Sequence, residues 1–182
     1  MTPLCAIGDS NIFRADGFPE WPVAFPNCLN YGTAGITAKD FRAAYITDGA
    51  GVGDRANFPA SWDLSGNVLL MLGTNDINTA GETAATISTN IMAIESIIRR
   101  DMTNGLVYVC EIIPRFFGGL PYAEQLRIDT NAALRAKSYN QLPPVFEVPR
   151  LILSDYIAEP GGGALHLNNS GMAKFIAAVQ AA

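Results

Sequence analysis

The stretch Val68-Leu-Leu-Met-Leu-Gly-Thr-Asn-Asp76 joins an unbroken apolar run to a polar turn. An apolar run without alternating polar residues is typical of a strand that is buried on both faces of a parallel sheet. The segment Glu82–Arg100 follows, and Thr79 with Glu82 has the spacing of a capping box at its start. Its isoleucines recur at steps of four, three and four residues: Ile87, Ile91, Ile94 and Ile98. This spacing gives a helix one apolar stripe, so the stretch predicts a strand followed by a helix that packs on it.

The rest of the chain repeats this alternation. Four other short apolar runs end in turn residues and predict further strands: Leu4–Ile7, Cys28–Tyr31, Leu106–Ile113 and Val145–Val148. Two more helices are predicted, at Pro121–Lys137 and Ser170–Val179. We therefore predict one α/β domain over residues 1–182, with a parallel sheet and helices on both of its faces.

The composition argues against several classes of function. Hydrophobic residues make up 49% of the 182 residues, and the net charge of −5 accompanies only 12 Lys and Arg residues, which are scattered. Nucleic acids are bound by clustered basic residues and membrane surfaces by basic amphipathic stretches, so we expect neither partner. The first residues, Met1–Cys5, show neither a signal-peptide pattern nor a transmembrane run, so the sequence does not identify the compartment and a cytoplasmic location is the default expectation. Cys5, Cys28 and Cys110 are expected to be free thiols in apolar surroundings.

Polar, glycine-containing turns follow three of the predicted strands, and a fourth polar segment precedes the last helix. They are Gly8-Asp9-Ser10, Gly32-Thr33-Ala34-Gly35, Gly73-Thr74-Asn75-Asp76 and His166-Leu167-Asn168. In an open α/β sheet, ligands bind outside the carboxyl ends of the strands. We therefore expect these four segments to form one site.

The four segments contain the groups that acyl transfer requires. A serine hydroxyl is a weak nucleophile and needs a base within hydrogen-bond reach. Ser10 is the candidate nucleophile, and His166, the single histidine of the chain, is the candidate base. A tetrahedral oxyanion needs preorganised donors, which the Gly35 N–H and the Asn75 amide can supply. No metal, nucleotide or organic cofactor is implied.

The order of these segments resembles the SGNH (GDSL) hydrolases, a family of serine esterases and lipases. The resemblance runs from Gly8 to about Gly171 and rests on four features. These are GDS near the N-terminus, a glycine turn after the second strand, GxND after the third strand and a late histidine. The resemblance implies a three-layer α/β/α, flavodoxin-like fold with a five-stranded parallel sheet.

The same resemblance implies the roles of individual residues. Ser10 would be the nucleophile and His166 the general base. The N–H groups of Ser10 and Gly35 and the side chain of Asn75 would form the oxyanion hole. Two further residues stand where members of the family often carry the same type: Trp21 and Asn131.

One position departs from the family pattern. The family usually has an aspartate three residues before the catalytic histidine, and Gly163 occupies that position here. A backbone carbonyl of the Gly161–Gly163 turn could accept the imidazole Nδ1–H, or Asp155 or Glu159 could replace the aspartate. We expect the carbonyl, because Asp155 and Glu159 precede His166 by eleven and seven residues and the turn suggests no route back to the imidazole. A degenerate site is the remaining alternative.

Several of these residues also have ordinary structural interpretations. Ser10 could cap a helix, and Asn75 and Gly35 could be turn residues. Asp9 and Asp76 are expected to be structural and to hydrogen-bond the turns in which they lie. Three aromatic residues after Pro114 could line a substrate pocket or simply pack: Phe116, Phe117 and Tyr122.

The sequence thus predicts a hydrolase that cleaves carboxylic esters through a Ser10 acyl-enzyme. Short acyl groups, such as O-acetyl groups on a carbohydrate, are the expected substrates, by analogy with the family. The alternative function is an inactive module of the same fold that binds a glycan or a protein partner. Gly163 in place of the usual aspartate is the main support for that alternative.

Overall fold

The protein is described by a computed structural model that covers residues 4–15, 17–47, 55–56, 58–59, 62, 64–102, 104–141, 145–146 and 151–181. Its main sheet is parallel and has the strand order β2-β1-β5-β6-β9. The strands are β1 (Leu4–Gly8), β2 (Leu29–Gly32), β5 (Asn67–Met71), β6 (Val107–Cys110) and the two-residue β9 (Val145–Phe146). The predicted α/β class with a parallel sheet is confirmed; the last two residues of the strand predicted at Val145–Val148 lie outside the described residues.

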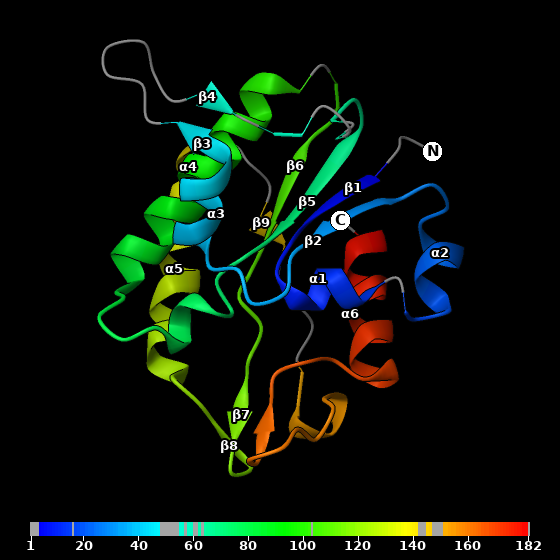
Figure 1. Ribbon diagram of the computed structural model, residues 1–182, viewed down its shortest axis with the longest axis vertical. Helices are drawn as coiled ribbons and strands as arrows, with labels where there is room; N and C mark the ends of the chain where they lie inside the picture. Colours follow the sequence, from blue (N-terminus) through cyan, green and yellow to red (C-terminus); the bar gives the residue numbers. More distant parts are fainter. Residues whose placement is uncertain are drawn as a thin grey trace.

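Helices cover both faces of this sheet. They are α1 (Ser10–Ala15), α2 (Glu20–Ala24), α3 (Ala38–Tyr45), α4 (Ala84–Asp101), α5 (Glu124–Gln141) and α6 (Asn169–Ala181). Figure 1 shows α3, α4 and α5 on one side of the sheet and α1, α2 and α6 on the other. Among the described helices, none is both long enough and apolar enough to cross a membrane.

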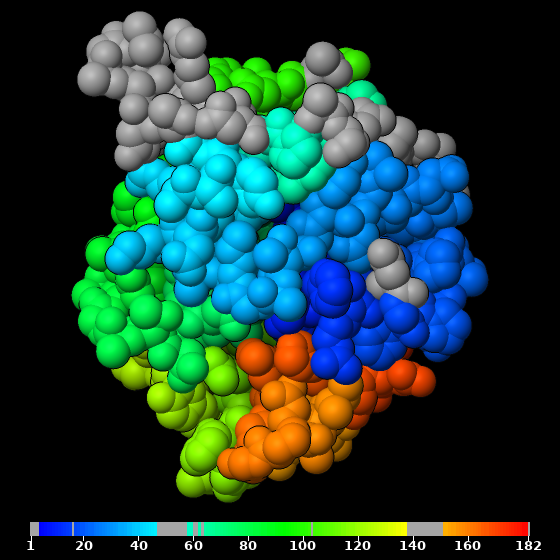
Figure 2. Space-filling view, viewed as in Figure 1, coloured from blue at the N-terminus to red at the C-terminus, as the bar shows by residue number. Residues whose placement is uncertain are grey.

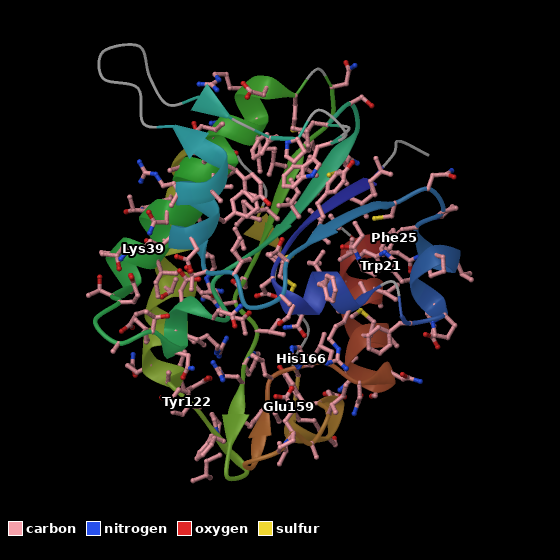
Figure 3. The ribbon with its side chains drawn as sticks, in the orientation of Figure 1. Trp21, Phe25, Lys39, Tyr122, Glu159 and His166 are labelled. Carbon is pink, nitrogen blue, oxygen red and sulfur yellow. The ribbon has the colours of Figure 1, made fainter. Side chains whose placement is uncertain are left out.

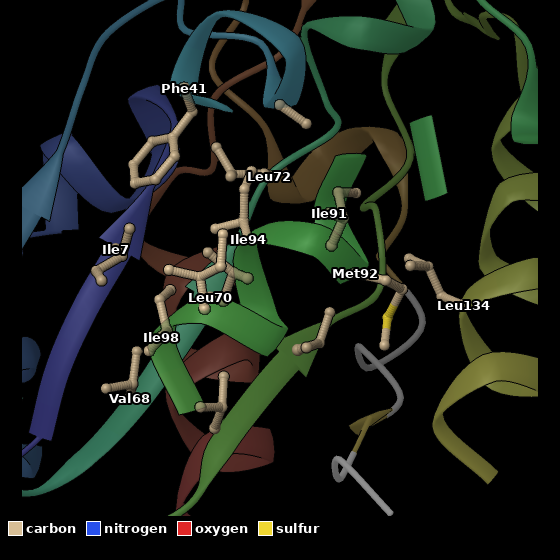
Figure 4. Close-up of a cluster of buried hydrophobic side chains, with 14 of the residues drawn as sticks. Ile7, Phe41, Val68, Leu70, Leu72, Ile91, Met92, Ile94, Ile98 and Leu134 are labelled. Atoms are coloured by element: carbon tan, nitrogen blue, oxygen red, sulfur yellow. The ribbon is translucent and has the colours of Figure 1, made fainter. Parts of the chain in front are cut away.

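The central strand β5 contributes to both hydrophobic cores. Val68 and Leu70 belong to the cluster that includes residues of α3, α4 and α5, whereas Leu69 and Met71 belong to the cluster with residues of α1, α2 and α6. All four side chains are buried, which explains the unbroken apolar run in the sequence. The predicted isoleucine stripe of α4 is also confirmed, because its four residues are 0% exposed and belong to the first cluster. Figure 4 labels three of them, Ile91, Ile94 and Ile98.

The start of α4 differs from the prediction by a few residues. Thr83 and Thr86 form the capping box, not Thr79 and Glu82, because the helix begins at Ala84. The Glu82 carboxylate instead accepts a hydrogen bond from the Thr86 hydroxyl at 2.7 Å. The hydroxyl of a threonine at the third helical position thus takes the part that the motif usually gives to Glu or Gln.

A small antiparallel sheet lies beyond the carboxyl ends of the main strands (Figure 1). Its order is β10-β7-β8, and its strands are β7 (Phe116–Phe117), β8 (Leu120–Pro121) and β10 (Gly163–Ala164). The prediction that a helix begins at Pro121 is therefore wrong: Pro121 pairs with Phe116 in this sheet, and α5 begins at Glu124. The sheet joins the segment after β6 to the segment before α6, which carries the single histidine.

The remaining elements are short. Strands β3 (Ile46–Thr47) and β4 (Arg55–Ala56) form an antiparallel pair, and η1 (Asp76–Asn78) and η2 (Leu153–Asp155) are single turns of 3₁₀ helix. The three cysteines are free thiols, as expected: Cys5 and Cys110 are buried, and Cys28 is partly buried.

Asp76 ties the turn after β5 to the start of α3. Both oxygens of its carboxylate accept from the Ala38 N–H, at 3.0 and 2.8 Å. Asp76 was expected to hydrogen-bond its own turn, and its main partner is instead this neighbouring helix. Burial raises the pKa of the carboxyl group to about 6, although the hydrogen bond from Ala38 acts in the opposite direction.

We predict that Asp76 makes stability depend on pH. Its pKa is higher in the folded chain than in the unfolded chain, so the folded state binds more protons between the two values. The stability from this proton is lost as the pH rises through about 6. Relative to an Asp76→Asn variant, the free energy of unfolding of the parent should fall by about 2 kcal/mol between pH values of about 4.5 and 8. Denaturant unfolding at both pH values measures this difference, and a constant or rising difference would contradict the prediction.

Candidate active site

The turns that were predicted to form one site lie at one edge of the sheet. Strands β2, β1 and β5 are adjacent and parallel, so the residues that follow them are neighbours. Ser10 follows β1, Gly35 lies after β2, and Asn75 lies after β5. In Figure 2 these segments, in blue, light blue and green, meet the orange segment before α6 on one face of the molecule.

Ser10 and His166 are in hydrogen-bond contact. The Ser10 Oγ lies 2.9 Å from the His166 Nε2. The other ring nitrogen, Nδ1, contacts the carboxylate of Glu159, and Figure 3 shows the two residues close together. In this arrangement an imidazole can take the serine proton while a carboxylate orients the ring.

A glycine turn brings Glu159 to His166. Gly161 and Gly162 have φ angles of +85° and +82°, a left-handed conformation that glycine adopts without steric cost. The chain reverses at these two residues, and backbone hydrogen bonds of 2.9 Å join the two arms. We call residues 157–166 the His166 hairpin. Because its arms are antiparallel, the acid and the imidazole become cross-strand neighbours.

The expectation that a backbone carbonyl accepts the imidazole Nδ1–H is therefore wrong. The Gly163 carbonyl accepts from the Glu159 N–H, and the Gly162 carbonyl accepts from the Gly118 N–H, both at 2.9 Å. These carbonyls hold the hairpin together and join it to the β7–β8 turn. The carboxylate reaches the imidazole because two successive left-handed glycines close the turn, which the sequence analysis did not anticipate.

Asp155, the other candidate acid, binds α6 instead. Its carboxylate accepts hydrogen bonds from the Lys174 Nζ at 2.7 Å, the Ser170 Oγ at 2.9 Å and the Ile152 N–H at 2.9 Å. The hydrogen bond from Lys174 is the main cause that lowers the pKa of Asp155. Asp155 therefore fastens η2 to α6.

Asn11 is a positioning residue that the sequence analysis missed. Its side chain accepts from the Leu167 N–H at 3.2 Å and donates to the Leu165 carbonyl at 3.5 Å. These two residues flank His166, so the neighbour of Ser10 holds the backbone on both sides of the imidazole. The only signal in the sequence was a polar residue directly after Ser10, at a position that is 2% exposed in the fold.

Asn75 and Gly35 belong to turns that are bonded to each other. The Asn75 amide donates to the Ile36 carbonyl at 2.9 Å. A side-chain amide has two N–H donors, so this bond leaves one for a ligand. Gly35 is exposed and has a φ angle of +76°, a backbone conformation that favours glycine. Both residues thus present candidate donors at the edge where Ser10 lies.

Asp9, the acidic residue next to Ser10, has a structural role. Asp9 is buried and accepts from the Asn11 N–H at 2.9 Å, which agrees with the expected role within its own turn. Burial raises the pKa of Asp9, while the hydrogen bond from Asn11 and the charge of His166 act in the opposite direction. Among the described residues, no group of three or more His, Cys, Asp or Glu side chains could hold a metal ion.

Trp21 and Asn131 hold helices against the sheet. Trp21 (labelled in Figure 3) is 1% exposed. Its ring stacks on that of Phe175 in α6 with centroids 6.4 Å apart. Asn131 in α5 accepts from the Ile112 N–H at 2.8 Å and donates to the Ile112 carbonyl at 3.0 Å. The two bonds of Asn131 fix the segment that follows β6 and leads to β7.

The three aromatic residues after Pro114 divide into two roles. Phe116 is buried and packs on Tyr156 with ring centroids 5.3 Å apart. Phe117 and Tyr122 are exposed, lie 6.3 Å apart between ring centroids, and line a cavity of about 340 Å³. Packing is therefore the role of Phe116, and the other two belong to a cavity wall.

Comparisons with known proteins agree with this fold. No protein-family model and no curated protein sequence matches the chain. A carbohydrate acetylesterase family member from Sinorhizobium meliloti superimposes with a TM-score of 0.65 at 16% identity, over 100% of this chain and 96% of that one. A member of the lipolytic protein G-D-S-L family from Veillonella parvula gives 0.60 at 18% identity, over 100% and 96%. The native aryl esterase of M. smegmatis gives 0.64 at 14% identity, over 100% and 97%. The resemblance identified in the sequence therefore extends to the fold.

We predict that Glu159→Gln lowers kcat for p-nitrophenyl acetate by about 10²- to 10⁴-fold, because an amide stabilises an imidazolium poorly and favours the wrong tautomer. The matched control is Asp155→Asn, which should change kcat only a few-fold while lowering the melting temperature, because it weakens the contact with Lys174. Steady-state kinetics and thermal unfolding of both variants give the comparison. A folded Glu159→Gln variant with the parent kcat would refute the role of Glu159.

Proposed function

We propose that this chain is a serine-dependent carboxylic ester hydrolase of the SGNH/GDSL type, built as one three-layer, flavodoxin-like domain whose five-stranded sheet includes the short β9. The contact between Ser10, His166 and Glu159 at the carboxyl edge of a parallel sheet is the observation that carries this proposal. The fold shared with G-D-S-L lipolytic proteins and esterases supports it.

The first half of the reaction acylates Ser10. The His166 Nε2 accepts the Ser10 proton as the Oγ attacks the acyl carbon, and the 2.9 Å separation of these atoms suits that transfer. Glu159 is a positioning residue: its carboxylate holds the imidazole and stabilises the imidazolium that forms. The imidazolium then gives its proton to the departing alcohol.

The negative oxygen of the tetrahedral intermediate needs donors that are already in place. The proposed donors are the N–H groups of Ser10 and Gly35 and the free N–H of the Asn75 amide. The bond from Asn75 to the Ile36 carbonyl fixes the plane of that amide before substrate arrives. Donors that are fixed in this way do not have to reorganise during the reaction. This preorganisation is the main source of electrostatic stabilisation of an oxyanion.

The second half of the reaction releases the acid. Water attacks the acyl carbon while His166 takes one of its protons, and Ser10 recovers its own proton from the imidazolium as the acyl bond breaks. The reaction consumes one ester and one water and yields one acid and one alcohol. The alternative of an inactive binding module rested on Gly163 in place of an acid, and the contact from Glu159 removes that support.

We propose short acyl groups, with acetyl esters of carbohydrates first among them. Exposed residues rim the site, including Gly35 and the aromatic pair Phe117 and Tyr122, so a polar alcohol has access from solvent. The similar fold of a carbohydrate acetylesterase family member supports an acetyl ester.

Ser10→Ala should abolish hydrolysis of p-nitrophenyl acetate, with a loss of at least about 10³-fold in kcat, because it removes the hydroxyl on which the proposed acyl-enzyme forms. The circular dichroism spectrum should be that of the parent. Ser96→Ala, on the exposed side of α4, is the matched control and should keep the parent rate. Mass spectrometry after a fluorophosphonate probe should find the adduct on Ser10. Retained turnover in folded Ser10→Ala would defeat the assignment.

Asn75→Ala should lower kcat by about 10²- to 10³-fold with little change in KM, because an oxyanion donor acts mainly in the transition state. Asn104→Ala, in an exposed turn, serves as the control with the same side-chain truncation. Initial rates over a range of substrate concentrations separate kcat from KM. An effect on KM alone would show that Asn75 binds the ground state.

A further inference from the structure

A cavity beside the candidate site has a cationic and aromatic wall. It measures about 340 Å³ and is lined by Asn78, Arg115, Phe117 and Tyr122. The Arg115 guanidinium lies over the Tyr122 ring, 5.5 Å from its centroid. Figure 3 shows Tyr122 on the same side of the molecule as Glu159 and His166. None of the four lining residues has a part in the proposed acyl transfer.

The cavity adjoins the proposed machinery through three connections. Asn78 ends η1, the turn that begins directly after Asn75. Phe117 pairs with Gly163 in the small sheet, three residues before His166. The negative charge of Glu159 also acts on Arg115. The cavity is therefore lined by residues from the segment that follows Asn75 and from the strand that pairs with the His166 hairpin.

Arg115 differs from most arginines of the described structure. Arg99, Arg100, Arg127 and Arg135 each form an ion pair with a carboxylate. Within the described residues, no carboxylate forms an ion pair with Arg115, although this side chain is half-buried. Burial lowers its pKa, while Tyr122 and Glu159 oppose that change. A guanidinium stays charged in proteins, so the cavity is lined by a cation that has no ion pair with a carboxylate among the described residues.

We propose that Arg115 binds a carboxylate carried by the alcohol portion of the ester substrate, with Phe117 and Tyr122 packing against the ring that bears it. The inference rests on the proposed function and names its substrate class: acetyl esters of acidic alcohols, such as acidic sugars or hydroxybenzoates. A planar guanidinium matches a carboxylate through two parallel hydrogen bonds, and aromatic side chains supply the apolar contact that orients a ring.

The position of the cavity indicates that Arg115 contacts the alcohol portion of the ester and not its acyl portion. The leaving oxygen must lie near His166, because the imidazolium protonates it. Phe117 in the wall of this cavity pairs with Gly163 in the His166 hairpin, so we assign the group next to Arg115 to the leaving alcohol. The chain has a net charge of −5, and a local cation is what lets an anionic substrate approach this face.

The test uses two acetyl esters that differ in one remote charge, 4-acetoxybenzoate and its neutral methyl ester. The measured quantity is the ratio of kcat/KM for the anionic ester to that for the neutral ester. Arg115→Gln should lower this ratio by about 10- to 100-fold, mostly through KM, because it removes a charge-assisted pair. Arg115→Lys should lower this ratio less, because lysine keeps the positive charge and loses only the paired hydrogen bonds of the planar guanidinium.

Arg100→Gln is the matched control for net charge. Arg100 lies at the end of α4, paired with Asp101, at the end of the molecule away from the carboxyl edge (Figure 1). In Arg100→Gln the ratio of kcat/KM values for the two esters should stay within about twofold of the parent ratio, as expected for an exposed ion pair. An unchanged ratio in Arg115→Gln, or an equal fall in Arg100→Gln, would overturn the proposal.

Binding separates this inference from the proposed function. Calorimetry on Ser10→Ala measures the affinity for 4-acetoxybenzoate without turnover. Adding Arg115→Gln to this variant should weaken that affinity by about 10- to 100-fold and should weaken the affinity for the methyl ester less. If the parent hydrolyses neither ester but Ser10→Ala shows this pattern, the hydrolase proposal fails and the carboxylate site stands. If hydrolysis depends on Ser10 but Arg115→Gln changes neither the rate ratio nor the affinity ratio, the carboxylate site fails and the hydrolase stands.

Discussion

Burial of β5 on both faces is the constraint on which the rest of the structure depends. Its side chains alternate between two cores, so helices must cover both sides of the sheet. Its neighbours are parallel to it, so every connection crosses over and the carboxyl ends of the strands meet at one edge. Ser10, Gly35 and Asn75 are far apart in sequence, and the parallel strands bring the turns that carry them to the same edge.

Side-chain bonds to backbone atoms turn this edge into a defined geometry. Asp76 holds the start of α3, Asn75 holds the Ile36 carbonyl, and Asn11 holds the backbone around His166. In each of these bonds the second group is a backbone N–H or carbonyl, so the bond does not depend on which side chain that second residue carries. The polar residues that follow the strands therefore serve two purposes, since they carry the proposed chemistry and also lock the loops that present it.

The sequence was sufficient for features that depend on periodicity and order. It predicted the main strands, α4 with its isoleucine stripe, and the meeting of the Ser10 and His166 segments at the strand ends. It did not predict α1, α2, α3 or the small sheet, because these elements are short and tertiary contacts stabilise them more than local propensity does. The Glu159 contact was misjudged because it depends on the φ angles of Gly161 and Gly162, and the same residues would suit many other turns. Asn11 had no distinguishing pattern, since its role exists only once the hairpin has folded against α1.

The His166 hairpin has a mechanical consequence. Glu159 and His166 stand on opposite arms of one short antiparallel unit, whereas Ser10 stands on another element. The contact between Ser10 Oγ and His166 Nε2 therefore crosses between two elements, whereas the contact between Glu159 and His166 lies within one. The Asn11 bonds and the pairing of Gly163 with β7 attach the hairpin to the rest of the fold. The alignment of the proposed nucleophile and base therefore depends on how firmly these two attachments hold the hairpin.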